Sequence, residues 1–347
     1  MTKQMRVAMY YSNRDVRLEK IPVPTIGEGE ILMKIEASGI CGSDVMEWYR
    51  RDKVPLVLGH EVAGTVEKVG KGVQKFIKGD RIVAAHHVPC NTCEYCHQGN
   101  HTACQSLQGG TNFHPGGFSE FVRLPAINVD RGTFPIPEGV SFEDATFAEP
   151  LGCVLRGQKK MLIKHGASVF IIGTGISGIL HVSLARAMGA GKIITADISD
   201  YRNDMAMRFG ADEAVLSDSG LAANLIKANG GKKAHYVIVC TGAMPAIKAA
   251  LESVDKGGCV LLFAPTAEGQ TMPFSVNDVF WKKEVTLMTT YAAAPADHVA
   301  ALELIRAGTI PVDEMITHRF GLKDAQKGFS LVAGSGDSVK VIILPQK

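Results

Sequence analysis

Several features that mark other classes of protein are missing from this sequence. Nowhere do about 18 apolar residues run together without a charge, so we expect no membrane-spanning helix. The first residues contain no apolar run of about seven residues after a basic region, which argues against a secretory leader. The net charge of +2 is not the basic excess typical of nucleic-acid-binding proteins. We therefore expect a soluble, cytoplasmic protein whose partners are small molecules rather than nucleic acid or membrane.

The chain of 347 residues is long enough for two domains, and 46% of it is hydrophobic, so each domain can bury its own core. It contains no internal repeat and no low-complexity segment. From residue 1 to about 150, short β-like runs alternate with Gly and Pro. This pattern predicts an irregular, mostly β domain.

After Glu149-Pro150, strands begin to alternate with helical patterns. Six strands are expected, at 168–172, 193–197, 214–216, 236–240, 259–263 and 285–290, with helices at 179–188 and 201–209. Such alternation indicates an α/β fold with a doubly wound parallel sheet. A helix at 296–307 and a strand at 339–344 follow, and the residues alone do not decide which domain they join.

A glycine-rich turn follows the first of these strands. Gly173, Gly175 and Gly178 have the spacing GxGxxG and stand between a predicted strand and a predicted helix. In this context the glycines allow a tight turn, a close approach of the backbone to a pyrophosphate, and close packing of helix on strand. The helix N-terminus also offers N–H groups to phosphates. The motif therefore predicts dinucleotide binding.

Asp197 ends the second strand, where an acid can hold both ribose hydroxyls of a dinucleotide. Because an acid repels a 2′-phosphate, NAD is favoured over NADP. Arg202 leaves two alternatives open: stacking on the adenine, or an ordinary solvated charge on a helix.

Half of the eight cysteines lie close together, with the spacing Cys-x2-Cys-x2-Cys-x7-Cys: Cys90, Cys93, Cys96 and Cys104. A reducing compartment disfavours disulfides, and bacterial ferredoxins have a shorter last gap followed by Pro. Four unliganded thiols would be open to oxidation. The lack of Lys and Arg between Cys90 and Cys104 disfavours a zinc ribbon for nucleic acid. The spacing favours a closed, structural zinc site with four thiolates.

A second, scattered group of possible ligands consists of Cys41, His60, Glu61 and Glu149, in the stretches CGSD, GHE and AEP. Mixed cysteine, histidine and carboxylate ligands suit a catalytic zinc with an open position. Singly, a buried cysteine, a loop histidine and a surface glutamate are each more often structural. The residues alone therefore do not link these four.

CGSD, GHEVAGTV, the four-cysteine loop, AEP and GTGISG occur in this order, and the chain resembles the zinc-dependent medium-chain dehydrogenases over nearly its whole length. It is most similar to the polyol branch, typified by sorbitol dehydrogenase, and to L-threonine dehydrogenase. The resemblance implies a GroES-like catalytic domain at 1–150 with a structural-zinc lobe at 90–104. It also implies a Rossmann NAD-binding domain at 151–294, a segment at 295–347 that returns to the catalytic domain, and a homo-oligomer, either a tetramer or a dimer.

The resemblance also implies roles for individual residues. Cys41 and His60 are expected to bind the catalytic zinc, with Glu61 or Glu149 completing the set and exchanging with water or substrate. The positions expected to contact NAD are Gly173, Gly175, Ser177, Gly178, Asp197, Arg202, Phe263, Ala264, Pro265, Thr289, Thr290 and Tyr291.

By the same resemblance, Asp44 holds the His60 ring and Ser43 passes the proton of the substrate hydroxyl outward. The alternative for Ser43-Asp44 is a simple helix N-cap. Where relatives commonly carry a relay histidine, this chain has Met46. The proton must then leave through water, through another residue such as His86 or His87, or through the cofactor ribose.

These expectations describe an enzyme with two zinc ions per chain, one catalytic and one structural. A secondary alcohol, polyol or sugar-derived, would give up its hydroxyl proton to Ser43 and a hydride to NAD, yielding a ketone. Because residues 46–49 lie where relatives shape the substrate pocket, the substrate stays open. The alternatives are an L-threonine-type amino-alcohol dehydrogenase and a non-catalytic zinc- and nucleotide-binding protein.

Overall fold

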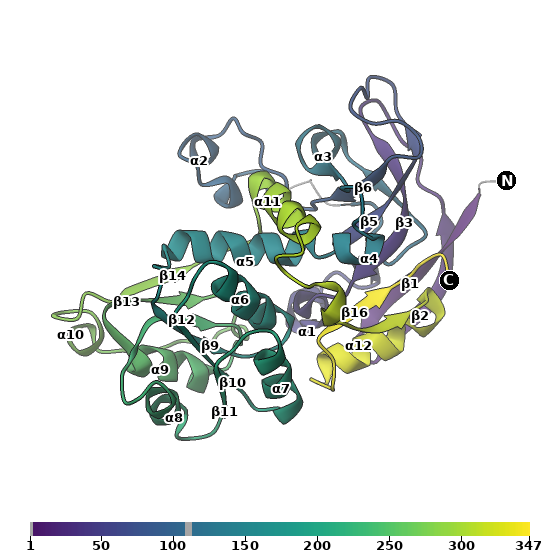
Figure 1. Cartoon of the computed structure of the whole chain (residues 1–347). Coiled ribbons are helices and arrows are strands. Elements are labelled where there is room, and N and C mark those ends of the chain that lie inside the picture. The colour runs from purple at the N-terminus through teal and green to yellow at the C-terminus, as the bar shows by residue number, and fades with distance from the viewer. Residues whose placement is uncertain (1–2, 108–112) are drawn as a thin grey trace. The chain divides into compact units, whose positions relative to one another are not determined.

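The computed structural model describes residues 3–107 and 113–347 (Figure 1). The chain divides into two compact units, one formed by Met1–Gly152 with Ala292–Lys347 and the other by Cys153–Tyr291. No helix within the described ranges is both long enough and apolar enough to cross a membrane.

The second unit contains a six-stranded parallel sheet in the order β11-β10-β9-β12-β13-β14 (Figure 1). From the central β9 the chain builds outward to one edge, then returns and builds toward the other. This order is that of the doubly wound dinucleotide-binding fold. The strands are β9 (Ser168–Ile172), β10 (Lys192–Asp197), β11 (Glu213–Leu216), β12 (Ala234–Val239), β13 (Val254–Leu262) and β14 (Thr286–Thr289). The six predicted strands and the parallel sheet are confirmed.

The sheet is covered on both faces, and its central strand β9 is apolar from Val169 to Ile172. All five residues of β9 are buried. Phe170 and Ile172 belong to one apolar cluster, and Val169 and Ile171 to another, as expected when successive side chains point to opposite faces. The helices of this unit are α6 (Ile176–Ala187), α7 (Asp200–Arg208), α8 (Leu221–Ala228), α9 (Met244–Ser253) and α10 (Val276–Val279).

The first unit is mostly β, as predicted. A seven-stranded sheet has the order β15-β16-β3-β5-β6-β8, with β7 paired to β3, and a three-stranded sheet has the order β2-β1-β4. The strands are β1 (Gln4–Ser12), β2 (Asp15–Pro22), β3 (Ile31–Gly39), β4 (Leu56–Val57), β5 (Glu61–Val69), β6 (Arg81–Ala84), β7 (Phe121–Leu124), β8 (Thr133–Pro135), β15 (Ile316–Phe320) and β16 (Lys340–Ile343).

Helices, most of them short, lie between these strands along the chain. They are η1 (Gly42–Val45), α1 (Glu47–Arg50), α2 (Glu94–His97), η2 (His101–Ala103), α3 (Ala126–Arg131), α4 (Phe142–Ala145), α11 (Pro295–Arg306), η3 (Asp313–Met315), η4 (Leu322–Asp324) and α12 (Ala325–Ala333). Helix α5 (Ala148–Met161) was not predicted, because its Pro150 reads as a breaker. Pro150 stands in the first turn, where a helix has no N–H bond to lose.

The C-terminal segment adds its last strand to the N-terminal sheet. Strand β16 pairs antiparallel with β3 and parallel with β15. The residues after Ala292 therefore share a core with the beginning of the chain, a point that periodicity alone left open.

Candidate metal sites and cofactor site

Cys41, His60 and Glu61 come together in the first unit. Their ligand atoms, one from each side chain, all lie within 4.8 Å of one another. Cys41 directly precedes η1, and His60 stands immediately before β5, which begins at Glu61. A thiolate, an imidazole and a carboxylate at such spacing form a donor set that fits a zinc ion. Glu149, in the first turn of α5, is buried but lies outside this group.

Asp44 holds both Cys41 and His60 in place. Its side chain is fully buried, and its Oδ2 accepts the N–H of Cys41 at 3.0 Å. Its Oδ1 lies 3.4 Å from His60 Nδ1. This contact turns Nδ1 toward the carboxylate and leaves Nε2 as the atom that can bind a metal.

The Asp44–His60 contact also shifts both pKa values. Burial would raise the pKa of Asp44, but His60, the N–H of Cys41 and the charge of Arg50 together lower it below its ordinary value. Burial would lower the pKa of His60, yet the Asp44 carboxylate raises it well above the ordinary value. Each group of the pair thus favours the charged form of the other, and a metal ligand at His60 has to be the neutral imidazole.

Two charged residues that the sequence analysis did not single out pack against this site. Arg50 donates to the carbonyl oxygen of Ser43 at 3.1 Å and lies 3.9 Å from Asp44 Oδ1. Lys340, from β16, forms a buried ion pair with Glu61. A lysine inside the apolar run of residues 339–344 was a signal for such a partner, whereas nothing in the sequence marked Arg50.

The histidines proposed for proton exit lie beside His60. The His86 ring is centred 4.6 Å from the His60 ring and 3.8 Å from the His87 ring. Burial lowers the pKa of His86 well below its usual value and that of His87 to about 4. Both rings are therefore neutral and add no charge to the site.

The segment that follows Cys41 is tied to the first hairpin through Asn13. Its Nδ2 donates to the carbonyl oxygen of Val45 at 2.8 Å, and its N–H donates to Glu47 Oε1 at 2.9 Å. Glu47 and Trp48 line a hollow of about 380 Å³ together with Tyr10 and Tyr11. The two hydrogen bonds of Asn13 therefore fix the segment that carries Ser43 and Met46.

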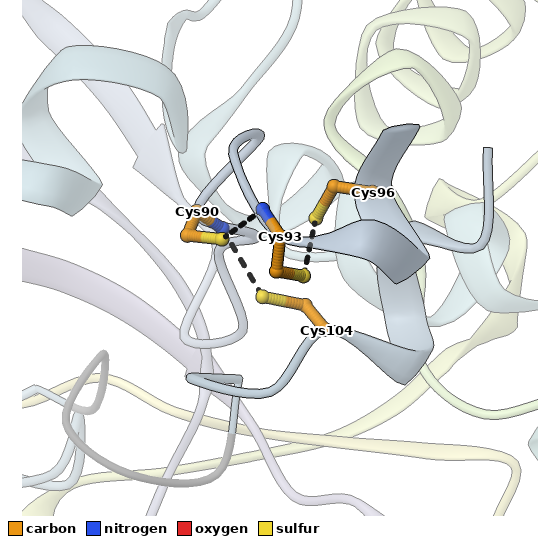
Figure 2. A group of neighbouring side chains, drawn as sticks. All are labelled: Cys90, Cys93, Cys96 and Cys104. Carbon is orange, nitrogen blue, oxygen red and sulfur yellow. Dashed lines mark hydrogen bonds between the residues drawn. The ribbon is translucent and has the colours of Figure 1, made fainter. Parts of the chain in front are cut away.

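The four clustered cysteines form a second group in the first unit. Their sulfur atoms lie within 4.8 Å of one another and turn toward a common centre (Figure 2). Cys93 Sγ and Cys96 Sγ are 3.6 Å apart. A tetrahedral ion with ligands at about 2.3 Å requires sulfur–sulfur separations of roughly 3.8 Å. The group thus fits a single bound zinc ion.

Backbone N–H groups point at these sulfurs. Cys90 Sγ accepts from the N–H of Cys93 at 3.3 Å, and Cys104 Sγ accepts from the N–H of Cys90 at 3.2 Å. Hydrogen bonds from Thr92 and Cys93 lower the pKa of Cys90 to about 5, whereas burial raises that of Cys96 to about 12. These N–H groups add partial positive charge beside the sulfurs of Cys90 and Cys104, as suits thiolate ligands.

In the second unit, the glycine turn has the geometry its motif predicts. Gly173 has φ 93°, a left-handed conformation that favours glycine. A Cβ at Gly178 would come within 2.0 Å of the Gly173 carbonyl oxygen, so helix and turn pack closely there. A Cβ at Gly175, the N-cap of α6, would meet open space. This space before the helix fits a dinucleotide pyrophosphate.

Asp197 closes the same turn from the end of β10. Its Oδ2 accepts the N–H of Thr174 at 2.7 Å, and its Oδ1 accepts the N–H of Ser199 at 3.1 Å. Ser199 caps α7, and its hydroxyl accepts the N–H of Arg202 in the first turn of that helix. The carboxylate thus links the glycine turn to the next helix and keeps lone pairs for a ligand hydroxyl.

Comparison with known proteins agrees with this architecture. A family model of the alcohol dehydrogenase GroES-like domain matches residues 27–138, and one of a zinc-binding dehydrogenase matches residues 177–307. A sorbitol dehydrogenase from Bombyx mori is 32% identical over 359 aligned positions, which cover 99% of this chain and 99% of that protein. The chain belongs to the zinc-dependent medium-chain dehydrogenases.

Two further relatives bear on what such a dehydrogenase can do. An L-threonine 3-dehydrogenase from Rhizobium johnstonii is 29% identical over 333 positions, covering 94% of each chain. A protein described as a zinc-binding dehydrogenase from Sinorhizobium meliloti, solved with NADP bound, superposes with a TM-score of 0.87 at 27% identity. That superposition covers 99% of this chain and 100% of the other. The GroES-like domain and the α/β fold expected of this dehydrogenase are confirmed.

The other positions predicted to contact NAD lie at or just after strand ends, apart from Ser177. Phe263, Ala264 and Pro265 follow β13, which ends at Leu262. Thr289 ends β14, and Thr290 and Tyr291 follow it. Ligands of doubly wound sheets bind beyond the carboxyl ends of the strands. Ser177 stands in the first turn of α6, beside the glycine turn.

Proposed function

We propose that this dehydrogenase interconverts a secondary alcohol, polyol or sugar-derived, and its ketone, with zinc and NAD(H) as cofactors. The observation that carries the proposal is the grouping of Cys41, His60 and Glu61, with Asp44 behind His60. A purely structural zinc has four protein ligands, whereas three leave a coordination position for substrate.

Cys41 and His60 are the proposed permanent ligands, and Glu61 or Glu149 the exchangeable one. A thiolate, a neutral imidazole and one carboxylate together carry two negative charges. The formal charge of this ligand set with Zn²⁺ would therefore be zero. Bound there, zinc supplies Lewis acidity that makes a hydroxyl proton easier to remove. Asp44 keeps the His60 ring in the tautomer whose Nε2 faces the metal.

Ser43 is proposed to accept the substrate proton at its hydroxyl and pass it outward. The carbonyl oxygen of this residue is held by Arg50, which fixes the backbone from which the hydroxyl projects. With Met46 in place of a relay histidine, His86 and His87 are candidates for the next step, because burial keeps them uncharged.

The second unit is proposed to bind NAD. The glycine turn and the start of α6 would hold the pyrophosphate, and Asp197 the adenosine ribose. When bound, the nicotinamide ring accepts or returns the hydride. Phe263 to Pro265 and Thr289 to Tyr291 are proposed to border that ring.

Replacing Cys41 or His60 with Ala tests the proposal. We expect each variant to lose NADH formation from alcohols and one metal ion per chain, and to bind NAD with little change. Cys153→Ala removes a cysteine that belongs to neither group of proposed metal ligands, so this variant should keep its activity and metal content. Full activity in Cys41→Ala or His60→Ala would contradict the zinc assignment.

The second candidate function is that of an L-threonine-type amino-alcohol dehydrogenase, favoured by the Rhizobium relative. NADH formation with L-threonine, compared with a series of polyols and sugars, separates the two. Absence of turnover with every alcohol, in protein that retains zinc and binds NAD, would favour a non-catalytic binding protein.

A further inference from the structure

Glu61 is held by a cation from the other end of the chain. Lys340 lies in β16 and Glu61 at the start of β5, and both flank β3 in the sheet. Their side chains are 0% and 1% exposed, and they form an ion pair. Lys340 Nζ also donates to the carbonyl oxygen of Ile40 at 3.2 Å. Two hydrogen-bond acceptors thus fix the position of the ammonium group.

The sheet is built to make room for this pair. Gly39, in the intervening strand, is opposite Glu61 on one side and Ile342 on the other. A Cβ at Gly39 would lie 1.9 Å from Glu61 Oε2 and 2.7 Å from Lys340 Cε. The lysine and the glutamate therefore meet directly over a glycine, and any larger residue at this position would push them apart.

The two oxygens of Glu61 face different partners. Oε2 accepts the hydrogen bond of Lys340, whereas the buried Oε1 has no partner among the described residues. Glu61 also belongs to the group with Cys41 and His60. One carboxylate thus stands between a fixed ammonium group and the ligand set proposed for zinc.

We propose that Lys340 is the positioning residue that makes Glu61 a releasable metal ligand. The inference rests on the proposed zinc site at Cys41 and His60. An ammonium group that shares the carboxylate weakens its donation to a metal. After release, Glu61 stays paired with Lys340, so that no uncompensated charge is left buried. Glu61 can therefore make way for an incoming ligand without leaving the protein interior.

Cobalt-substituted protein titrated with imidazole tests this without substrate. Imidazole competes with the exchangeable ligand for the metal and changes the visible spectrum of cobalt(II). The four-cysteine group has no open position, so its spectrum stays constant during the titration. In Lys340→Gln, whose amide still donates to Glu61 but carries no charge, we expect at least tenfold weaker imidazole binding and slower loss of zinc to a chelator.

Two charge-balanced variants serve as controls. Lys340→Arg keeps the cation and should bind imidazole within about threefold of the unmodified protein. Glu61→Gln with Lys340→Met removes both charges and leaves no carboxylate to displace, so its imidazole affinity should be no weaker than that of the unmodified protein. If Lys340→Gln does not fold, the double variant still tests the proposal. An imidazole affinity tenfold weaker than that of the unmodified protein would overturn it.

Unchanged imidazole affinity in Lys340→Gln would also overturn the inference, while leaving the proposed function standing. The two failures are distinguishable, because failure of the proposed zinc site would appear as the absence of a second metal at Cys41 and His60.

Discussion

At the scale of single residues, Asp197 combines a structural and a proposed binding role. Its two oxygens each accept a backbone N–H, from Thr174 in the glycine turn and from Ser199 at the start of α7. Loss of the carboxylate would therefore disturb the shape of the turn as well as any ribose contact. The negative charge adds a further effect, since it opposes the 2′-phosphate of NADP.

Asp197→Ala should lower kcat/KM with NAD by about tenfold or more, the cost of one hydrogen bond to a charged group. Because the repulsion disappears and Arg202 stays, kcat/KM with NADP should fall less or rise. Asp197→Asn, which keeps an acceptor for one N–H, should give an intermediate preference. Asp200→Ala removes a nearby exposed charge and should leave the preference unchanged. An unaltered NAD-to-NADP ratio in Asp197→Ala would remove this residue from the ribose site.

The residues of the two proposed sites also differ in how well the sequence alone predicted their roles. The glycines of the turn and Asp197 were predicted because strand, turn and helix are adjacent in the chain. Lys340 was not, since its partner is 279 positions away and only strand order brings them together. Arg50 was missed because an arginine after a tyrosine in a short helix carries no pattern of its own.

At the scale of elements, helices α5 and α6 share a buried polar contact in the second unit. Gln158 donates to His181 Nδ1 at 3.1 Å and to the His181 carbonyl oxygen at 2.8 Å. His181 is fully buried, and its Nε2 has no partner within the described ranges. The ring packs edge-on against Phe263, with centroids 4.7 Å apart. Such a ring is held neutral because a proton there would be buried without compensation.

This burial predicts how stability depends on pH. It lowers the pKa of His181 to about 3, below the ordinary value near 6.5. Between these pH values the unfolded chain binds the proton and the folded chain does not. The contribution of His181 to stability is thus fully present above about pH 6.5 and is lost as pH falls, by up to ~1.4 kcal/mol per pH unit.

Denaturant unfolding from pH 7 to pH 4 measures this dependence. In His181→Leu and His181→Gln, the free energy of unfolding should fall less steeply as pH is lowered than in the unmodified protein. The slopes should differ by up to the value for one bound proton, ~1.4 kcal/mol per pH unit. Other titrating groups, including metal ligands, act equally in all three proteins and cancel in the comparison. Identical slopes in all three would show that His181 is not buried as a neutral ring.

At the scale of the whole molecule, the two units differ in what stabilises them. The parallel sheet of the second unit is covered by apolar clusters on both faces. The lobe from Cys90 to Cys104 has only a small cluster of its own, with Cys96, Cys104 and Leu107 as its buried members. Because so little apolar surface is buried there, we expect the lobe to depend on a bound metal. Periodicity predicted the parallel α/β sheet, whereas only the family resemblance implied that the tail returns to the first unit. That return depends on the long-range pairing of β16 with β3.

Removal of one sulfur tests the dependence of the lobe on metal. We expect two zinc ions per chain in the unmodified protein and one in Cys93→Ser, with the melting temperature lowered by several degrees. The site at Cys41 and His60 should keep its metal, because it shares no ligand with the lobe. Cys153→Ser, outside both groups, should retain two zinc ions. Metal analysis decides the point: a count of one zinc per chain, retained when Cys93 is replaced, would mean that the four thiols hold no zinc and that the segment is ordered by protein contacts alone.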